Sequence, residues 1–105
     1  MPKGQRIQFK KWDCELVRRQ YQNGRVALEL VAWQNVPEQD IFEGEPVATC
    51  TVNLPQYPLA KDEVLIKDYS ENEGMLQTLL DAGVVELAGR TVKTGFVVLP
   101  VCILK

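Results

Sequence analysis

Alternating apolar and polar positions in the first third of the chain predict a β-hairpin over residues 12–33. Asn23-Gly24 lies at its centre, and a two-residue type I′ turn needs a positive φ at both central positions, which these two residue types tolerate. A two-residue turn at this point sets Arg18 opposite Glu29, so we expect a cross-strand ion pair between them. Apolar residues on both strand faces indicate that the base of the hairpin is covered on both sides.

A polar, acidic segment interrupts this pattern at residues 34–45 and is expected to be a long loop. Ile41 and Phe42 lie within it, and we expect them to anchor the loop to the core, with an exposed contact as the alternative. Strict alternation returns at residues 46–54 and predicts a third, half-buried strand. Pro55 follows directly and ends that strand.

The clearest helical signal lies between Ser70 and Gly83. Ser70 followed by Glu73 fits a capping box, and Gly83 is a typical residue just after a helix. These signals predict a helix of about three turns that begins at Ser70. Its apolar stripe is formed by Met75, Leu76, Leu79, Leu80 and Ala82.

The last part of the chain is almost wholly apolar and predicts a strand over residues 96–104 that is buried on both faces. Pro100 lies in its middle and favours an edge position or a bulge. A short apolar run at residues 64–66 is either a further strand or a buried segment that leads into the helix. Residues 84–95 form either a small ribbon or a return path.

Together these elements predict one domain, residues 1–105, of the α+β class. We expect an antiparallel sheet of about four strands, in the order β-hairpin, strand, helix, strand, with one main helix packed on one face. A single helix cannot cover both faces of such a sheet. Because an apolar strand left at a bare edge pairs with other chains, we expect a homodimer that uses uncovered sheet surface or the last strand.

The composition of the chain excludes several kinds of catalytic and metal-binding site. The 105 residues include no histidine, which removes the commonest general base and the commonest metal ligand. Cys14, Cys50 and Cys102 are too few and too far apart for an all-cysteine zinc site or a disulfide framework. We expect them to be reduced thiols in the core of a cytoplasmic protein, and we predict no catalytic residue, cofactor or metal. No apolar run is long enough for a membrane span, and none follows the first residues as a secretory signal would.

Charge is unevenly distributed along the chain. Residues 1–25 contain seven basic and two acidic residues, whereas residues 26–105 contain five basic and twelve acidic ones. A basic hairpin with interleaved aromatic residues is one way to contact nucleic acid. The net charge of −2 and the pI near 5.1 disfavour nucleic acid as the main partner, because such domains are usually basic.

The densest polar cluster spans residues 68–73 and includes Tyr69. Several oxygens at a helix start could hold a divalent cation or a cationic group of a partner. Capping and solvation explain the cluster as well, and its spacing matches no calcium loop.

Leu65-Ile66-Lys67-Asp68-Tyr69-Ser70-Glu71-Asn72-Glu73-Gly74, together with Gly89-Arg90 and Gly95-Phe96-Val97, resembles a family of small uncharacterised proteins of bacteria, phages and mobile elements. The resemblance covers residues 12–105, and the Tyr-Ser-Glu-Asn-Glu-Gly string is its most specific part. It implies a cytoplasmic accessory protein and assigns no activity, so it identifies no catalytic residue.

The sequence therefore favours a small non-enzymatic protein that binds an unknown protein partner. The alternative is a nucleic-acid-associated accessory module that uses the basic hairpin. The candidate contact residues come from the basic hairpin, the acidic loop and the polar cluster: Lys10, Arg18, Arg19, Arg25, Ile41, Phe42 and Tyr69.

Overall fold

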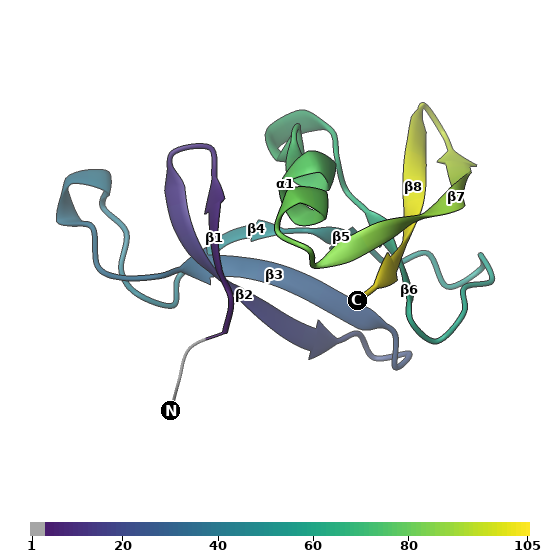
Figure 1. The fold of residues 1–105 in the computed structure, drawn as a ribbon, viewed down its shortest axis with the longest axis horizontal. Helices are drawn as coiled ribbons and strands as arrows, with labels where there is room; N and C mark the ends of the chain where they lie inside the picture. Colours follow the sequence, from purple (N-terminus) through teal and green to yellow (C-terminus); the bar gives the residue numbers. More distant parts are fainter. Residues whose placement is uncertain (1–3) are drawn as a thin grey trace.

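Two four-stranded antiparallel sheets and one short α-helix form the part of the chain that the computed structural model describes, residues 4–105 (Figure 1). The first sheet has the order β1-β2-β3-β4 and contains β1 (Arg6–Phe9), β2 (Trp12–Gln20), β3 (Val26–Ala32) and β4 (Pro46–Thr49). The second has the order β5-β6-β8-β7 and contains β5 (Thr51–Val52), β6 (Glu63–Ile66), β7 (Val85–Thr94) and β8 (Val97–Leu104). The helix α1 spans Met75–Asp81, and short 3-10 helices span Pro37–Gln39 and Ser70–Asn72. The α+β prediction with mainly antiparallel strands is confirmed, whereas the prediction of one sheet was wrong.

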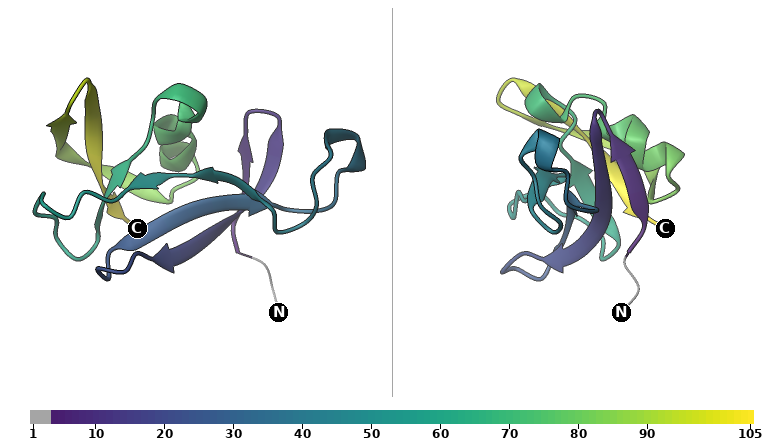
Figure 2. Two further views of the ribbon diagram at one scale, coloured as in Figure 1. Left: turned by 180° about the vertical axis from the view of Figure 1, so that it is seen from behind. Right: turned by 90° about the vertical axis from the view of Figure 1, so that its left-hand side faces the viewer.

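A single extended segment joins the two sheets, and Cys50 is the point where it changes partners (Figure 2, left). The Cys50 amide donates to the carbonyl of Leu28 in β3, at 2.8 Å. Its carbonyl accepts from the amide of Lys67, just after β6, also at 2.8 Å. The predicted strand over residues 46–54 is therefore divided into β4, which pairs with the first sheet, and β5, which pairs with the second.

The β2–β3 hairpin lies where the sequence predicted, but its register differs by one residue. The Tyr21 amide donates to the Arg25 carbonyl and the Gly24 amide to the Tyr21 carbonyl, which closes a three-residue loop. Gly24 alone adopts a positive φ there, +85°. Arg18 consequently faces Leu28 rather than Glu29, because a shift of one residue moves every side chain to the opposite face.

The helix begins later than predicted. Ser70 starts a 3-10 helix at a φ of +54°, and α1 begins only at Met75 after Gly74, which has a φ of +95°. The Ser70 side chain makes no capping hydrogen bond, so the capping-box prediction was wrong. Instead, the Leu76 amide donates to Asp68 Oδ1 at 2.8 Å.

The helix ends as predicted, and its apolar stripe lies on the core. The Gly83 amide donates to the Leu80 carbonyl and the Val84 amide to the Leu79 carbonyl, the two bonds of a Schellman motif around a left-handed glycine. Met75 and Leu79 are fully buried. The main core joins both sheets to α1 and includes Ile7, Phe9, Cys14, Leu28, Leu30, Cys50, Val64, Ile66, Met75, Leu79, Val85 and Cys102.

β7 and β8 form a hairpin, and β8 lies between β6 and β7 rather than at an edge. Pro100 faces Thr91 of β7, next to an irregularity between Leu87 and Thr91, so the bulge that Pro100 suggested is present on the partner strand. β6 pairs with residues 101–103 of β8, so residues 97–100 pair with β7 alone. The outer half of the hairpin therefore projects beyond the rest of the sheet (Figure 1).

Candidate interaction site

Large apolar side chains are at least half exposed at four positions among the described residues, and three of these lie on the β7–β8 hairpin. Phe96 is fully exposed, and Leu87 and Val98 are each 57% exposed. The fourth, Phe42, lies in the acidic loop and is 52% exposed. Single exposed apolar residues are ordinary, but three on one hairpin are typical of an interaction site.

The turn of this hairpin places Phe96 at its tip. Thr94 and Val97 pair directly, which leaves Gly95 and Phe96 as a two-residue turn. Gly95 has a φ of +56° at the first central position, as a type II′ turn requires. A side chain at the second central position has no opposite residue, so the ring of Phe96 projects into solvent.

The two faces of β8 have different surroundings. Leu99 and Val101 lie on one face and pack with Leu65 into a second cluster, which Leu54 and Leu59 cover. Residues at even positions lie on the other face, where Cys102 belongs to the main core. Val98 is on the same face as Cys102 but lies beyond the main core, and Leu87 is paired with Cys102 at the margin. We call the exposed residues Leu87, Phe96 and Val98 the hairpin patch.

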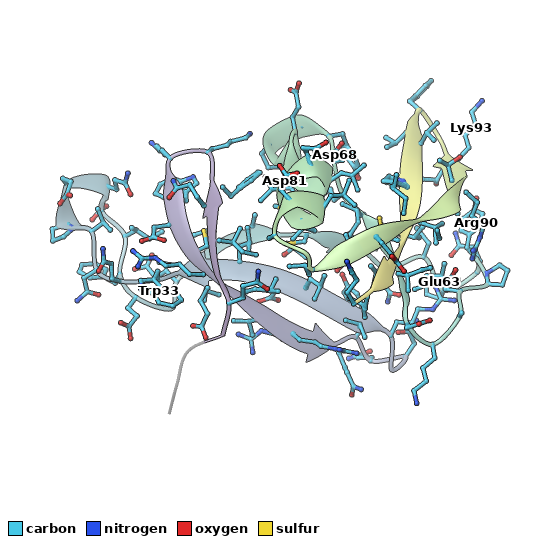
Figure 3. All side chains as sticks on the ribbon, viewed as in Figure 1. Trp33, Glu63, Asp68, Asp81, Arg90 and Lys93 are labelled. Carbon is cyan, nitrogen blue, oxygen red and sulfur yellow. The ribbon has the colours of Figure 1, made fainter. Side chains whose placement is uncertain are left out.

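The hairpin is held firmly at its base. Arg90, in the irregular part of β7, donates two hydrogen bonds to the carboxylate of Glu63 in β6, both at 2.6 Å (Figure 3). These bonds, with a further one from the Ala60 amide, lower the pKa of Glu63 to about 2. A bidentate pair fixes orientation as well as distance, so the patch is presented on a braced hairpin.

The edge of the hairpin is also protected. The Tyr57 hydroxyl donates to the carbonyl of Lys93 in β7 at 3.1 Å. The loop that contains Tyr57 is in turn held by Arg25, whose guanidinium donates to the carbonyls of Leu54 and Tyr57 at 2.8 and 2.5 Å. A bulge, a lysine and a covering loop are features that prevent edge-to-edge pairing of strands. The exposed face of the hairpin, rather than its edge, is therefore the free surface.

The predicted basic contact residues do not gather into one patch. Lys10 lies in the β1–β2 turn and donates to the Glu71 carbonyl at 2.8 Å, whereas Arg25 lies in the β2–β3 loop, at the other end of β2 (Figure 1). Arg19 forms an ion pair with Glu29 at 2.9 Å, the residue that the sequence assigned to Arg18. Arg18 is exposed on β2. Most of these cations are thus engaged within the chain.

The apolar and aromatic candidates divide in a similar way. Ile41 is buried and anchors the acidic loop, as predicted, but Phe42 is exposed, so the anchor prediction was wrong for the second residue. Tyr69 is half-buried against the second cluster, with the ammonium of Lys67 5.5 Å from its ring centre.

A shallow pocket of about 270 Å³ lies beside β4, the edge strand of the first sheet. One wall bears an ion pair between Lys67 and Glu71, at 2.5 Å. The other polar group is the buried amide of Asn72, which donates to the Thr49 carbonyl at 2.6 Å. Lys67 and Glu71 are paired with each other and Asn72 is bonded to Thr49, so the pocket offers little unpaired charge to a ligand. The remaining lining residues are Pro46, Val47 and Ala48.

The three cysteines are fully buried free thiols, as the sequence predicted for core residues. Burial raises the pKa of Cys50 to about 12, and raises the pKa values of Cys14 and Cys102 to about 11. A nucleophilic cysteine needs the opposite shift and some exposure. Within residues 4–105 there is no cluster of three or more metal-ligating side chains. No helix in the same part of the chain is both long and apolar enough to cross a membrane.

Comparisons of the chain with family models, curated proteins and solved structures give no significant match. The family suggested by the Tyr-Ser-Glu-Asn-Glu-Gly string therefore stays a prediction. Within the fold, this string forms the 3-10 helix and the connection into α1.

The sequence analysis assigned residues 96–104 to a strand buried on both faces and named the last strand only as one possible contact of a homodimer, so it did not identify Leu87, Phe96 and Val98 as exposed residues. One local signal could have identified the tip of the hairpin. Gly95-Phe96 sits between two runs of strand-forming residues, and a glycine followed by a large apolar residue in a two-residue turn places that residue at the tip. No comparable signal marks Leu87 or Val98.

Proposed function

We propose that this protein is a non-enzymatic interaction module that binds a protein partner through the hairpin patch. The observation that supports this most directly is the exposure of Leu87, Phe96 and Val98 on one projecting hairpin. Aromatic residues at the centre of a patch are typical anchors in protein interfaces, because they bury a large area at a small cost in side-chain entropy.

Preorganisation of the hairpin supports the same proposal. The Arg90–Glu63 pair and the Tyr57 hydroxyl hold β7 at two points, so little backbone freedom is lost when a partner binds. Residues 87–100 contain two basic residues, Arg90 and Lys93, and no acidic residue. Arg90 is already paired with Glu63, so the exposed Lys93 is the charge that a partner meets, and the partner surface that fits is apolar with a carboxylate opposite Lys93.

Other features are in keeping with a binding role rather than catalysis. The chain has no histidine, and its thiols are buried with raised pKa values. Three unbridged cysteines also support a reducing, cytoplasmic location.

The test compares three forms of the full chain as bait in an extract of its native cells from which its own gene has been deleted, so that a second copy of the chain is not among the captured proteins. The hairpin variant combines Phe96→Ser with Val98→Thr, and Phe42→Ser is the matched control that removes an exposed aromatic ring outside the hairpin. Proteins retained by the wild type and the control but lost from the hairpin variant are then purified and titrated against all three forms. We expect at least a tenfold loss of affinity for the hairpin variant alone. Equal binding of every purified candidate by the hairpin variant would overturn the proposal.

A further inference from the structure

The two regions with exposed large apolar side chains lie on opposite sides of the molecule. In Figure 1 the acidic loop lies at the left-hand end of the longest axis, whereas the β7–β8 hairpin lies on the right-hand side with its turn pointing away from that axis. The molecule extends 41 Å along this axis. The two regions therefore cannot touch within one chain.

Their charges are complementary. Residues 34–45 contain four acidic residues and no basic one, and all four are exposed: Glu38, Asp40, Glu43 and Glu45. Residues 87–100 contain Arg90 and Lys93 and no acidic residue. Arg90 is already paired with Glu63, so the exposed Lys93 supplies the positive charge of the hairpin. The loop end thus combines Phe42 with four carboxylates, and the hairpin end combines Phe96 with Lys93.

The acidic loop presents Phe42 on an ordered turn. The Glu45 amide donates to the Phe42 carbonyl at 3.0 Å, and the Phe42 amide donates to Glu45 Oε1 at 3.2 Å. Gly44 occupies the left-handed region at a φ of +85° and donates to the Ala32 carbonyl of β3. Buried Ile41 fixes the other side of the turn. The loop is therefore organised to hold Phe42 outward, as the type II′ turn holds Phe96.

We propose that the hairpin patch of one copy docks on the acidic loop of a second copy, so that the protein assembles head to tail. The inference rests on the proposed function, because it names the partner of the hairpin patch. Aromatic contact between Phe96 and Phe42 forms the centre, and Lys93 lies opposite the carboxylates of the loop.

A contact between two different surfaces of the same chain does not close on itself by a two-fold axis, and it leaves one free hairpin and one free loop on every open assembly. Hairpin-to-hairpin pairing is disfavoured, because Lys93 is the exposed charge of the hairpin and a two-fold contact would bring its two copies together, with no carboxylate opposite them. Strand-edge pairing through β7 is disfavoured by the bulge and by the hydroxyl of Tyr57. The patch is small, so the association is expected to be weak and reversible.

Sedimentation equilibrium from low micromolar to millimolar concentration tests this geometry. The wild type should show an average mass that rises with concentration and passes two chains without a plateau. The hairpin variant, Phe96→Ser with Val98→Thr, and the loop variant, Phe42→Ser, should each remain monomeric alone. An equimolar mixture of the two should regain association, since one supplies an intact loop and the other an intact hairpin, and it should stop at two chains.

Circular dichroism establishes that each variant is folded. If the hairpin variant is not, Lys93→Glu replaces it, and Lys93→Glu combined with Asp40→Lys in one chain should associate at least tenfold more tightly than Lys93→Glu alone, because the exchanged charges then meet between copies. A monomeric wild type throughout the range would overturn head-to-tail assembly but leave hairpin-dependent binding of another protein intact. A dimer that forms equally well with Phe42→Ser would show a two-fold contact and would also overturn it. Loss of both self-association and every hairpin-dependent partner would remove the proposed function as well.

Discussion

Replacement of Asp68 by alanine should destabilise the protein, whereas replacement of Ser70 should have little effect. Asp68 Oδ1 accepts a hydrogen bond from the amide of Leu76, the second residue of α1, at 2.8 Å. That amide belongs to the first turn, where no carbonyl within the helix can accept it. Asp68 therefore performs the N-capping role from outside the helix, seven residues before its first residue.

The expected loss of unfolding free energy can be taken from N-cap substitutions in other proteins. Removal of a capping oxygen costs about 1 kcal/mol, within a range of about 0.5–2 kcal/mol. Leu76 is half-buried, so water can partly replace the carboxylate, and we expect a value near the middle of this range for Asp68→Ala. Asp68→Asn keeps an oxygen at the same position and should lose less than half as much. Ser70 is exposed and its hydroxyl makes no capping bond, so Ser70→Ala should stay within about 0.5 kcal/mol of the wild type.

Urea unfolding followed by circular dichroism measures the difference. With a slope of about 1–3 kcal/mol/M, a loss of about 1 kcal/mol lowers the midpoint by roughly 0.3–1 M. The slope itself should not change, because neither residue alters the area exposed on unfolding. Equal losses for Asp68→Ala and Ser70→Ala, or a loss for Ser70→Ala alone, would refute the assignment and restore the capping box that the sequence suggested.

Three further predictions concern the hairpins and the core. The pKa of Glu63 is about 2 in the folded protein and near 4.5 in the unfolded chain, so its ion pair stabilises the fold fully above pH 4.5 and this stabilisation should be lost as the pH falls toward about 2. In Arg90→Gln the free energy of unfolding should therefore depend less on pH between these two values. Gly24→Ala places a side chain at a φ of +85° with no atom near it, so the strain alone should cost about 1 kcal/mol, measurable by urea unfolding against Gln22→Ala as control. Thiol titration without reductant should find three thiols after denaturation and almost none to react before it, since burial and raised pKa values protect Cys14, Cys50 and Cys102.

Local sequence signals predicted the structural features that depend only on neighbouring residues, namely the apolar stripe and the end of the helix. The helix stripe that includes Met75 and Leu79 lies on the core, and Gly83 ends the helix through its left-handed conformation, because a 3.6-residue repeat and a C-terminal glycine depend only on nearby residues. The start of the helix was misplaced because Ser70 and Glu73 satisfy the spacing of a capping box. A 3-10 turn and Gly74 intervene, and the accepting oxygen comes from Asp68, outside the pattern that the sequence rule examines.

The register of the β2–β3 hairpin is a second feature that local sequence signals did not predict. Asn23-Gly24 suits a two-residue turn with both residues at positive φ, and it also suits a three-residue loop with Gly24 alone at positive φ. The two turns differ by one residue in register, and local chemistry does not separate them. Packing decides: in the observed register Cys14, Leu28 and Leu30 share the face that forms the main core.

The division of residues 46–54 between two sheets had no sequence signal. Ala48, Cys50 and Val52 keep a regular alternation through the point where the strand exchanges β3 for β6 as its partner. Alternation reports which face of a strand is buried, but not which edge is paired. Pairing on the two edges is set by contacts with residues far along the chain, Leu28 on one side and Lys67 on the other.

The exposure of the hairpin patch also depends on residues elsewhere in the chain rather than on the apolar character of the strand itself. Val98 and Val101 are equally apolar and lie in one strand, yet one is 57% exposed and the other is fully buried. Val101 lies on the face of β8 that the second cluster covers, whereas Val98 lies on the opposite face, where the main core reaches no further than Cys102. The extent of the main core therefore decides the exposure of Val98. The sequence therefore specifies a strand that is apolar beyond the point where this chain can cover it. Conflicts between an apolar pattern and the burial that one chain provides are expected at functional surfaces, and this conflict is the reason for placing the proposed binding role on the hairpin.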